Sequence, residues 1–427
     1  MPTFPKRSSF IRPLRDFLTT EAAGGAVVVL AAVAALIWAN SPWSGSYDSL
    51  WHTSFGIDLG RYRFEMDLRH WVNDALMAVF FFVVGLEIKR EIVEGELNDR
   101  RKAIVPVVAA FGGMIVPALI FVLVTVGTPS ARGWGVPMAT DIALAIGILA
   151  LAGSRVPAGA KLFLLALAIV DDIGAISVIA VFYGQGGNRA WLLPAVATVG
   201  ATLLLKRHGV NAIAVYVVLG VALWFALHEA GVHATVAGVV MGLLAPTKPV
   251  LRSELIDVEE LGDVSTAEHA VATVRIARSS VSVVEWLEHL LHGWTSLLVV
   301  PMFALANAGI PLSSDAVADS LGSRTTWGVI LGLVIGKPLG ILLATFLVIR
   351  LGAGALPEET TWRDLTAAAV VAGVGFTVSL FVTELAFVGS MADQAKIGVV
   401  LASLVAGVAG LALAVTSSRS TLLAHER

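Results

Sequence analysis

The chain alternates between long apolar runs and short polar segments. A helix of about 20 apolar residues can cross the ~30 Å hydrocarbon core of a bilayer, and most of these runs approach that length. The runs cover residues 17–40, 69–91, 103–127, 134–152, 159–183, 190–206, 211–228, 232–246, 286–310, 325–350, 364–388 and 394–416. We therefore predict an all-α polytopic membrane protein with about 12 transmembrane helices, forming a single domain of residues 1–427. The seventh and eighth runs are short and close together, so they form either one hairpin or a pair that dips into the membrane.

Basic residues in the connections between runs predict the orientation. Lysine and arginine are enriched in cytoplasmic loops. If the N-terminus is inside, the inward connections hold clusters such as Lys89-Arg90, Arg100–Lys102 and Lys206-Arg207, whereas the outward ones hold few basic residues. Both termini are thus predicted to be cytoplasmic, in a multi-pass protein of the cell inner (plasma) membrane. The first run lacks a small-residue cleavage site, which favours an uncleaved helix over a secretory signal.

Two connections are longer than the others. Residues 43–69 place aromatic side chains at intervals among two glycines, the pattern of an external β-hairpin. This hairpin is either an ordered external loop or an exposed edge that pairs with a second copy of the chain. Residues 247–284 form a cytoplasmic loop of mixed charge that exceeds the usual loop length and is regulatory, partly helical or disordered.

Composition agrees with a membrane protein and excludes several classes of function. Hydrophobic residues make up 57% of the 427 and charged residues 14%, whereas a soluble domain is about a quarter charged. The net charge of −3 gives no support to a nucleic-acid partner, and the absence of cysteine excludes disulfides and thiolate chemistry. We expect a lipid-embedded protein that is not an enzyme and needs no cofactor.

Helix-weakening sequences interrupt two of the runs at corresponding places. The run 134–152 contains Pro137-Met-Ala-Thr-Asp141, and the run 364–388 contains Gly373-Val-Gly-Phe-Thr377. Each is the middle member of a group of three runs, 103–183 and 325–416. Matching interruptions predict inverted repeats with two broken, crossing helices and a binding site at the breaks. The glycines at the second break fit close helix packing equally well.

The adjacent carboxylates Asp171 and Asp172 lie in the middle of an apolar run. A charged aspartate at that depth costs at least ~2.5–3.5 kcal/mol, so intramembrane acids usually face a cavity and mark a pathway. Successive helical residues turn by ~100°, which gives the two acids different neighbours. Carboxylates that exchange protons for a cation, with the hydroxyl of Thr140 and the carboxylate of Asp141 beside them, form a hard-oxygen site suited to alkali ions. The structural alternative is that these acids only neutralise Lys337.

Lys337 is the only lysine far inside an apolar run, and Pro338 follows it. It is either the ion-pair partner of one aspartate or a positive charge that neutralises the dipole ends of two broken helices.

Further titratable residues lie near the ends of the runs. Glu87 and Glu91 are one turn apart and form either a solvated helix end or a funnel that attracts cations. Glu288, His289 and His292 form Glu-His-Leu-Leu-His, which lacks the order and third ligand of a zinc site. This group is either a pH sensor or an ordinary interfacial cluster. His233 is a second titrating group or a simple cap.

Several motifs in order resemble the NhaA family of sodium/proton antiporters. They are Phe80-Phe-Phe-Val-Val-Gly-Leu-Glu-Ile-Lys-Arg-Glu, Ala139-Thr-Asp-Ile-Ala-Leu-Ala, Leu165-Ala-Leu-Ala-Ile-Val-Asp-Asp-Ile-Gly-Ala, Gly231-Val-His-Ala-Thr and Gly336-Lys-Pro-Leu-Gly. The resemblance covers about residues 17–416. It implies electrogenic export of Na+ or Li+ for more than one H+, and a homodimer formed through the external hairpin.

The resemblance also implies roles for individual residues. Asp171 and Asp172 correspond to the ion and proton pair, with Asp172 the principal ligand and Asp171 the partner of Lys337. Thr140 and Asp141 correspond to the broken-helix residues beside them. The residues implied in pH sensing are Glu87, Glu91, Glu288, His289 and His233. Glu384, near the outer end of the second broken run, is an additional acid for which the sequence predicts no role.

Two other classes of protein share some of these features with a sodium/proton antiporter. An intramembrane aspartyl protease needs its aspartates on separate helices with a Gly-x-Gly-Asp signature, which this sequence lacks. A symporter of organic anions shares broken helices but needs a pocket for an organic solute, whereas these polar residues suit bare ions. We therefore expect alternating access, in which Asp171 and Asp172 bind sodium on the inside and take up protons on the outside.

Overall fold

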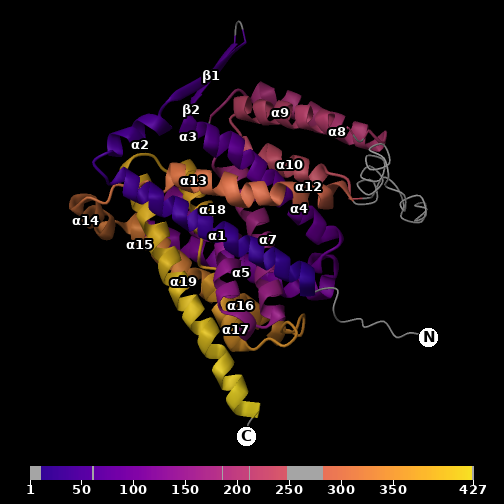
Figure 1. The fold of residues 1–427 in the computed structure, drawn as a ribbon, viewed down its shortest axis with the longest axis vertical. Coiled ribbons are helices and arrows are strands. Elements are labelled where there is room, and N and C mark those ends of the chain that lie inside the picture. Colours follow the sequence, from indigo (N-terminus) through magenta and orange to yellow (C-terminus); the bar gives the residue numbers. More distant parts are fainter. Residues whose placement is uncertain (1–10, 60–61, 185, 211, 248–281, 426–427) are drawn as a thin grey trace, which may run out of the picture. The chain divides into compact units, whose positions relative to one another are not determined.

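The computed structural model describes residues 11–59, 62–184, 186–210, 212–247 and 282–425, and helices make up most of them (Figure 1). The chain divides into two compact units. Unit 1 comprises Met1–Met77, Asp99–Gly184 and Ser296–Arg427, and unit 2 comprises Ala78–Asn98 and Gln185–Thr295. Most of the predicted loop 247–284, residues 248–281, lies outside the described residues.

Unit 1 holds most of the helices and the single hairpin seen in the described part of the chain. Its elements are α1 (Ile11–Ala39), α2 (Ser44–Trp51), β1 (Ser54–Leu59), β2 (Tyr62–Asp67), α3 (Leu68–Trp71), η1 (Val72–Leu76), α5 (Arg100–Thr125), η3 (Pro129–Gly133), η4 (Val136–Met138), α6 (Ile142–Leu151), η5 (Gly153–Arg155), α7 (Ala158–Phe182), η9 (Thr295–Val299), α13 (Val300–Asn307), α14 (Ser314–Gly322), α15 (Arg324–Leu331), η10 (Gly332–Gly336), α16 (Lys337–Arg350), α17 (Trp362–Val371), α18 (Phe376–Ala386) and α19 (Ser390–His425).

Unit 2 is a smaller helical unit. Its elements are α4 (Met77–Val93), η2 (Glu96–Asn98), η6 (Arg189–Trp191), α8 (Leu192–Arg207), α9 (Ile213–Ala230), α10 (Thr235–Leu244) and α12 (Val283–Trp294). Helix α9 ends at Gly231, whose positive φ of 76° is the left-handed conformation that favours glycine at a helix C-terminus.

Within the described residues, nine helices are long and apolar enough to cross a membrane, or eleven if each bent pair counts as one span. The predicted run 232–246 corresponds to α10, which has only ten residues. The count of about twelve therefore stays a prediction. Large apolar side chains such as Leu123 on α5 and Leu193 on α8 are more than two-thirds exposed, an arrangement that suits lipid as the surrounding solvent.

Both interruptions predicted from the sequence are present as bends. The segments Pro129–Met138 and Ile142–Leu151 meet at 47°, and Trp362–Val371 and Phe376–Ala386 meet at 43°. A break exposes backbone donors and acceptors, which membrane proteins tolerate only where other protein groups satisfy them. The inverted-repeat relationship between the two groups of helices stays a prediction.

Glycines bring α5 and α16 into close contact in unit 1. A Cβ placed on Gly112 would clash with the carbonyl oxygen of Gly340 and the side chain of Ala344, and a Cβ on Gly340 would clash with the carbonyl of Gly112. Further along, a Cβ on Gly336 would lie 2.8 Å from Cα of Pro117. Small residues of this kind let helix backbones approach closely in membranes, and here they set the position of the helix that begins with Lys337.

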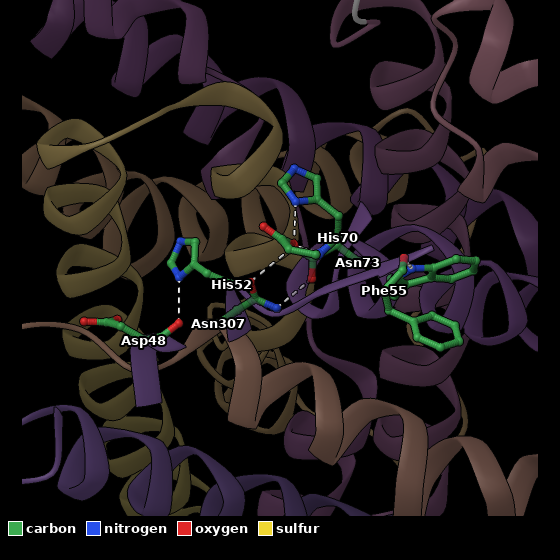
Figure 2. A network of polar contacts seen from close by, with 8 residues as sticks. Asp48, His52, Phe55, His70, Asn73 and Asn307 are labelled. Atoms are coloured by element: carbon green, nitrogen blue, oxygen red, sulfur yellow. Dashed lines mark hydrogen bonds and ion pairs between the residues drawn. The ribbon is translucent and has the colours of Figure 1, made fainter. Parts of the chain in front are cut away.

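The predicted hairpin is an antiparallel pair of strands that runs in register from Ser54 opposite Asp67 to Leu59 opposite Tyr62. The indole of Trp71 donates to the carbonyl of Phe55 at 2.9 Å, which fastens the hairpin to the helix that follows (Figure 2). Asp67 caps that helix by accepting from the backbone and ring of His70. Partial burial acts to raise the pKa of Asp67, but these hydrogen bonds outweigh it and lower the pKa below its usual value.

Polar side chains also fix the end of α13. Asn73 and Asn307 exchange hydrogen bonds between their amides at 2.7 and 3.2 Å, and Figure 2 shows the two facing each other. The Tyr47 hydroxyl lies 2.9 Å from the carbonyl of Leu305 and 3.0 Å from that of Ala306. Burial raises the pKa of Tyr47 to about 12, so its hydroxyl remains a donor throughout the physiological pH range. These contacts join α2 and η1 to the last turn of α13.

The glycine contact between α5 and α16 yields a test. We expect Gly112→Ala to destabilise the protein by about 1–3 kcal/mol, because the new methyl group forces two packed backbones apart. Gly200→Ala on α8 is the matched control: a Cβ there meets nothing within 4 Å, and alanine is the better helix former by about 1 kcal/mol. Thermal unfolding of both variants in detergent measures the difference. Equal melting temperatures for the two variants would contradict the close contact.

Candidate ion-binding site

The two helix breaks contact each other through Asp141. Its backbone N–H donates to the carbonyl of Val374 at 2.7 Å, and its Oδ2 accepts from the backbone and hydroxyl of Thr377 at 3.0 and 2.6 Å. Its Oδ1 accepts from the backbone of Leu144 at 3.0 Å. One carboxylate therefore caps the first turns of both α6 and α18, where the helix dipoles favour negative charge. Both of its oxygens are engaged in holding the breaks together.

Hydroxyl groups add to this junction. Ser379 of α18 donates to the carbonyl of Val136 at 2.8 Å. The Thr140 hydroxyl lies 2.7 Å from Oδ2 of Asp171 and 3.1 Å from the carbonyl of Ala372. A hydroxyl carries a single hydrogen and can also accept, so Thr140 can change between these two acceptors, or accept a bond itself, without moving far.

Asp171 and Lys337 form an ion pair inside unit 1. Both residues are 0% exposed, and Nζ of Lys337 lies 2.5 Å from Oδ2 of Asp171. The same ammonium donates to the carbonyl of Met138, at the end of the first half of the broken segment. Oδ1 of Asp171 accepts no hydrogen bond from the described residues. Lys337 thus neutralises an aspartate and a helix end together, which combines the two interpretations of this lysine that the sequence left open.

Asp172 is also buried, one residue further along α7. The ~100° turn between neighbours points it to a different side of the helix from Asp171, yet its charge still acts on Lys337. Two carboxylates therefore share the field of one lysine. In the part of the chain that the structure describes, no group of three or more histidine or acidic side chains is arranged to hold a metal ion.

The local sequence explains how Lys337 reaches this position. The helix that carries it contains the π-helical turn η10, Gly332–Gly336, immediately before the lysine. An inserted π turn changes the face that the following residues present and is frequent at functional sites. Pro338 follows the lysine within the same continuous helix, Arg324–Arg350, where proline removes one hydrogen bond of the helix backbone.

The residues implied in pH sensing lie in unit 2, and part of the group is assembled. Arg90 on α4 lies 2.5 Å from Glu288 on α12, and Glu87 lies 3.3 Å from Nδ1 of His292. His289 is exposed. Glu288 and His292 are four residues apart and so share a helix face. The resemblance in sequence assigns pH sensing to His289 and does not pair His292 with Glu87. The helical spacing of Glu288 and His292 is the signal that could have pointed to His292.

The last two predicted residues occupy separate places. Glu91 is buried, and its carboxylate folds back over Gly95, filling the space that a Cβ on that glycine would need. His233 is buried just before α10, and its carbonyl accepts from the backbone of Val236 at 3.1 Å.

The buried ion pair yields a second test. Lys337→Ala leaves the Asp171 carboxylate without its cation, and we expect a loss of about 3–5 kcal/mol in stability at neutral pH. Asp171→Asn combined with Lys337→Met removes both charges and should recover much of that loss. Thermal unfolding in detergent measures each variant. A double variant no more stable than Lys337→Ala would show that the two charges are not coupled.

Comparison with known proteins assigns the family. Residues 15–414 match the family described as Na+/H+ antiporter 1. An Na+/H+ antiporter NhaA of Rhodopirellula baltica is 45% identical over 416 residues, covering 95% of this chain and 94% of the relative. An Na+/H+ antiporter NhaA 3 of Frankia alni is 48% identical over 402 residues, covering 93% and 87%.

The fold of this chain is similar to that of a solved antiporter structure. The sodium proton antiporter MjNhaP1 of Methanocaldococcus jannaschii superposes with a TM-score of 0.51 at 11% identity, covering 96% of this chain and 98% of its own. The apolar helices and the relatives together make this chain a multi-pass membrane transporter. The chain belongs to the NhaA family of Na+/H+ antiporters, transporters that exchange Na+ for H+.

Proposed function

We propose that this protein exports Na+ or Li+ in exchange for more than one H+ by alternating access, with Asp171 and Asp172 as the shared site for cation and protons. The observation that supports this most directly is the fully buried Asp171–Lys337 pair at the junction of two helix breaks, with Asp172 beside it. Such a site offers oxygen ligands to a hard monovalent ion and offers the same oxygens to protons.

Competition between the cation and protons for Asp171 and Asp172 drives the proposed transport cycle. At alkaline cytoplasmic pH both aspartates lose their protons, and the cation binds to Asp172, the hydroxyl of Thr140 and Asp171. Binding weakens the hold of Asp171 on Lys337, because two cations then compete for one carboxylate. After the change of access, protons from the outside neutralise the aspartates and release the ion. Asp141 keeps the two breaks in contact through its bonds to Val374 and Thr377.

The charges of this scheme make transport electrogenic. With both aspartates ionised, Lys337 protonated and one Na+ bound, the site is neutral. With both aspartates protonated and Lys337 still charged, the site carries one positive charge. The two crossings of the membrane therefore differ by one charge, which corresponds to two protons for each sodium ion. The membrane potential then acts on the returning step.

We assign regulation by pH to a cluster in unit 2 that contains Glu87, Arg90, Glu288 and His292. His292 lies beside Glu87, and histidine is the side chain that most readily gains charge near physiological pH. Protonation of His292 strengthens its pair with Glu87, while Arg90 holds Glu288. We assign Glu91, His289 and His233 supporting parts in this response, on the resemblance alone. We place the protein in the cell inner membrane. The distribution of basic residues favours cytoplasmic positions for both termini.

The role of the adjacent Asp171 and Asp172 is tested by Asp172→Asn. We expect this variant to lose sodium- and lithium-dependent proton movement in proteoliposomes, because asparagine can neither release a proton nor supply a negative ligand. Asp319→Asn, a change of the same kind at an exposed position on α14, is the control and should retain wild-type flux. Near-normal exchange in Asp172→Asn would overturn the assignment of the site.

The hairpin is assigned to a homodimer, in which exposed strand edges pair with those of a second copy. Replacing residues 54–67 by a short Gly-Ser turn should convert cross-linked dimers in native membranes to monomers. Proteoliposomes of the shortened protein should retain sodium-dependent proton flux, because the exchange site lies elsewhere in the unit. Dimers that persist without the strands would show that the hairpin is only an ordered external loop.

A further inference from the structure

Unit 1 contains a second lysine–carboxylate pair, away from the breaks. Lys396 on α19 is 5% exposed and forms an ion pair with Glu384 on α18. Glu384 is the only acidic residue of α18, and most of the other side chains of that helix are buried. Neither residue takes part in the exchange scheme above. An ion pair removed from water stabilises a fold only modestly at best, so its position calls for another explanation.

Helix α18 is a short rod with a joint at each end. Its first joint is the break at Ala372–Gly375, and its second follows Ala386, where Phe387 is extended and Gly389 has a φ of 62°. The first turn of the rod carries Thr377, which donates to Asp141. Glu384 lies seven residues later, ~10 Å along the axis. A tilt of the rod at the Glu384 end therefore moves Thr377 against Asp141.

Helix α19 provides the support to which the rod is tied. Gln394 lies beside Lys396. Its backbone carbonyl accepts from the Thr326 hydroxyl at 2.9 Å, and its side-chain Oε1 accepts from the Ser323 hydroxyl at 2.6 Å. These contacts anchor the first turns of α19 to the start of α15. The ion pair thus connects a hinged half-helix to an anchored one.

Several charged side chains surround the pair. Asp393 experiences the charges of Lys396, Glu384 and Arg69, and Tyr47 experiences those of Arg69, Asp48 and Glu384. Among the other elements that pack on α18, η3 contributes Arg132. Loss of Glu384 or Lys396 alone changes the net charge close to the rod by one.

We propose that the Glu384–Lys396 pair is a positioning device for the exchange site, which holds α18 so that Thr377 meets Asp141. This inference rests on the proposed function, because the effect it describes is on cation binding at the breaks. Without the pair, the rod tilts about its first joint, the bonds from Thr377 to Asp141 loosen, and the adjacent Thr140 shifts relative to Asp171. The apparent affinity for sodium then falls while the titrating aspartates themselves remain intact.

The test measures sodium-dependent proton flux in proteoliposomes for four variants. They are Glu384→Gln, Lys396→Met, the double variant with both changes, and the charge swap Glu384→Lys with Lys396→Glu. We expect each single variant and the double variant to raise the apparent KM for Na+ on the order of tenfold, with a smaller change in maximal rate. The charge swap restores an ion pair between positions 384 and 396 and should return the KM to within about threefold of wild type.

The double variant separates positioning from a simple burial penalty. It removes both charges, so a pair that only needed neutralising would show a normal KM in this variant, and that result would overturn the proposal. A charge swap that folds but keeps a raised KM would overturn it as well. Thermal unfolding in detergent identifies any variant that is not folded, and Lys396→Arg, which keeps the charge, then takes the place of the swap and should show a near-normal KM.

Two controls separate this inference from the proposed function. Lys161→Gln removes a lysine of α7 whose ammonium, among the described residues, donates to the carbonyl of Gly153, and it should leave the KM for Na+ unchanged. Asp172→Asn tests the exchange site itself. If that variant is inactive while the pair variants have a normal KM, the proposed function stands and the positioning role is wrong. If Asp172→Asn exchanges normally, the proposed function fails independently of the pair.

Discussion

Lys337 and Asp171 face each other where neither side chain is exposed to solvent. Removing two charges from water costs several kcal/mol for each ion, and their mutual attraction repays this only with good geometry and additional hydrogen bonds. Here the additional partners are the hydroxyl of Thr140 and the carbonyl of Met138. Both partners lie at the break between Met138 and Ile142. The ion pair and the breaks therefore depend on each other.

The hydrogen bonds and close helix contacts around the two breaks have the same physical reason. Irregular backbone inside a membrane must find hydrogen-bond partners within the protein. Asp141 satisfies donors on both broken helices, and Val374 accepts from its backbone. Glycines at 112, 336 and 340 then let neighbouring helices approach closely enough to place Lys337 beside α7. In the proposed exchange, a cation and protons compete for the carboxylate oxygens of this junction.

Polar groups elsewhere in unit 1 follow a related pattern. Asn73 with Asn307, Tyr47 with the end of α13, and Glu384 with Lys396 each join elements that are distant in the sequence. Such contacts are specific in direction, whereas apolar packing against lipid-like neighbours is not. They fix helix ends at defined positions.

The sequence by itself determined the class of protein and the position of its unusual features. Apolar length predicted the spans, proline and glycine predicted the interruptions, and an aspartate doublet in an apolar run indicated a functional site, because each of these signals is local. The aromatic pattern of residues 43–69 likewise predicted the hairpin that the structure contains. Partners were harder to predict. Asp141 stays a predicted third ion-binding carboxylate, and only the structure shows that its oxygens bond to Leu144 and Thr377. The role of His289 in pH sensing likewise stays a prediction, and only the structure shows that His292 contacts Glu87. Glu384 had no role until Lys396 was placed beside it. Only the tertiary structure decides such contacts, because composition and periodicity specify which face a residue occupies and not which residue of a distant helix it meets.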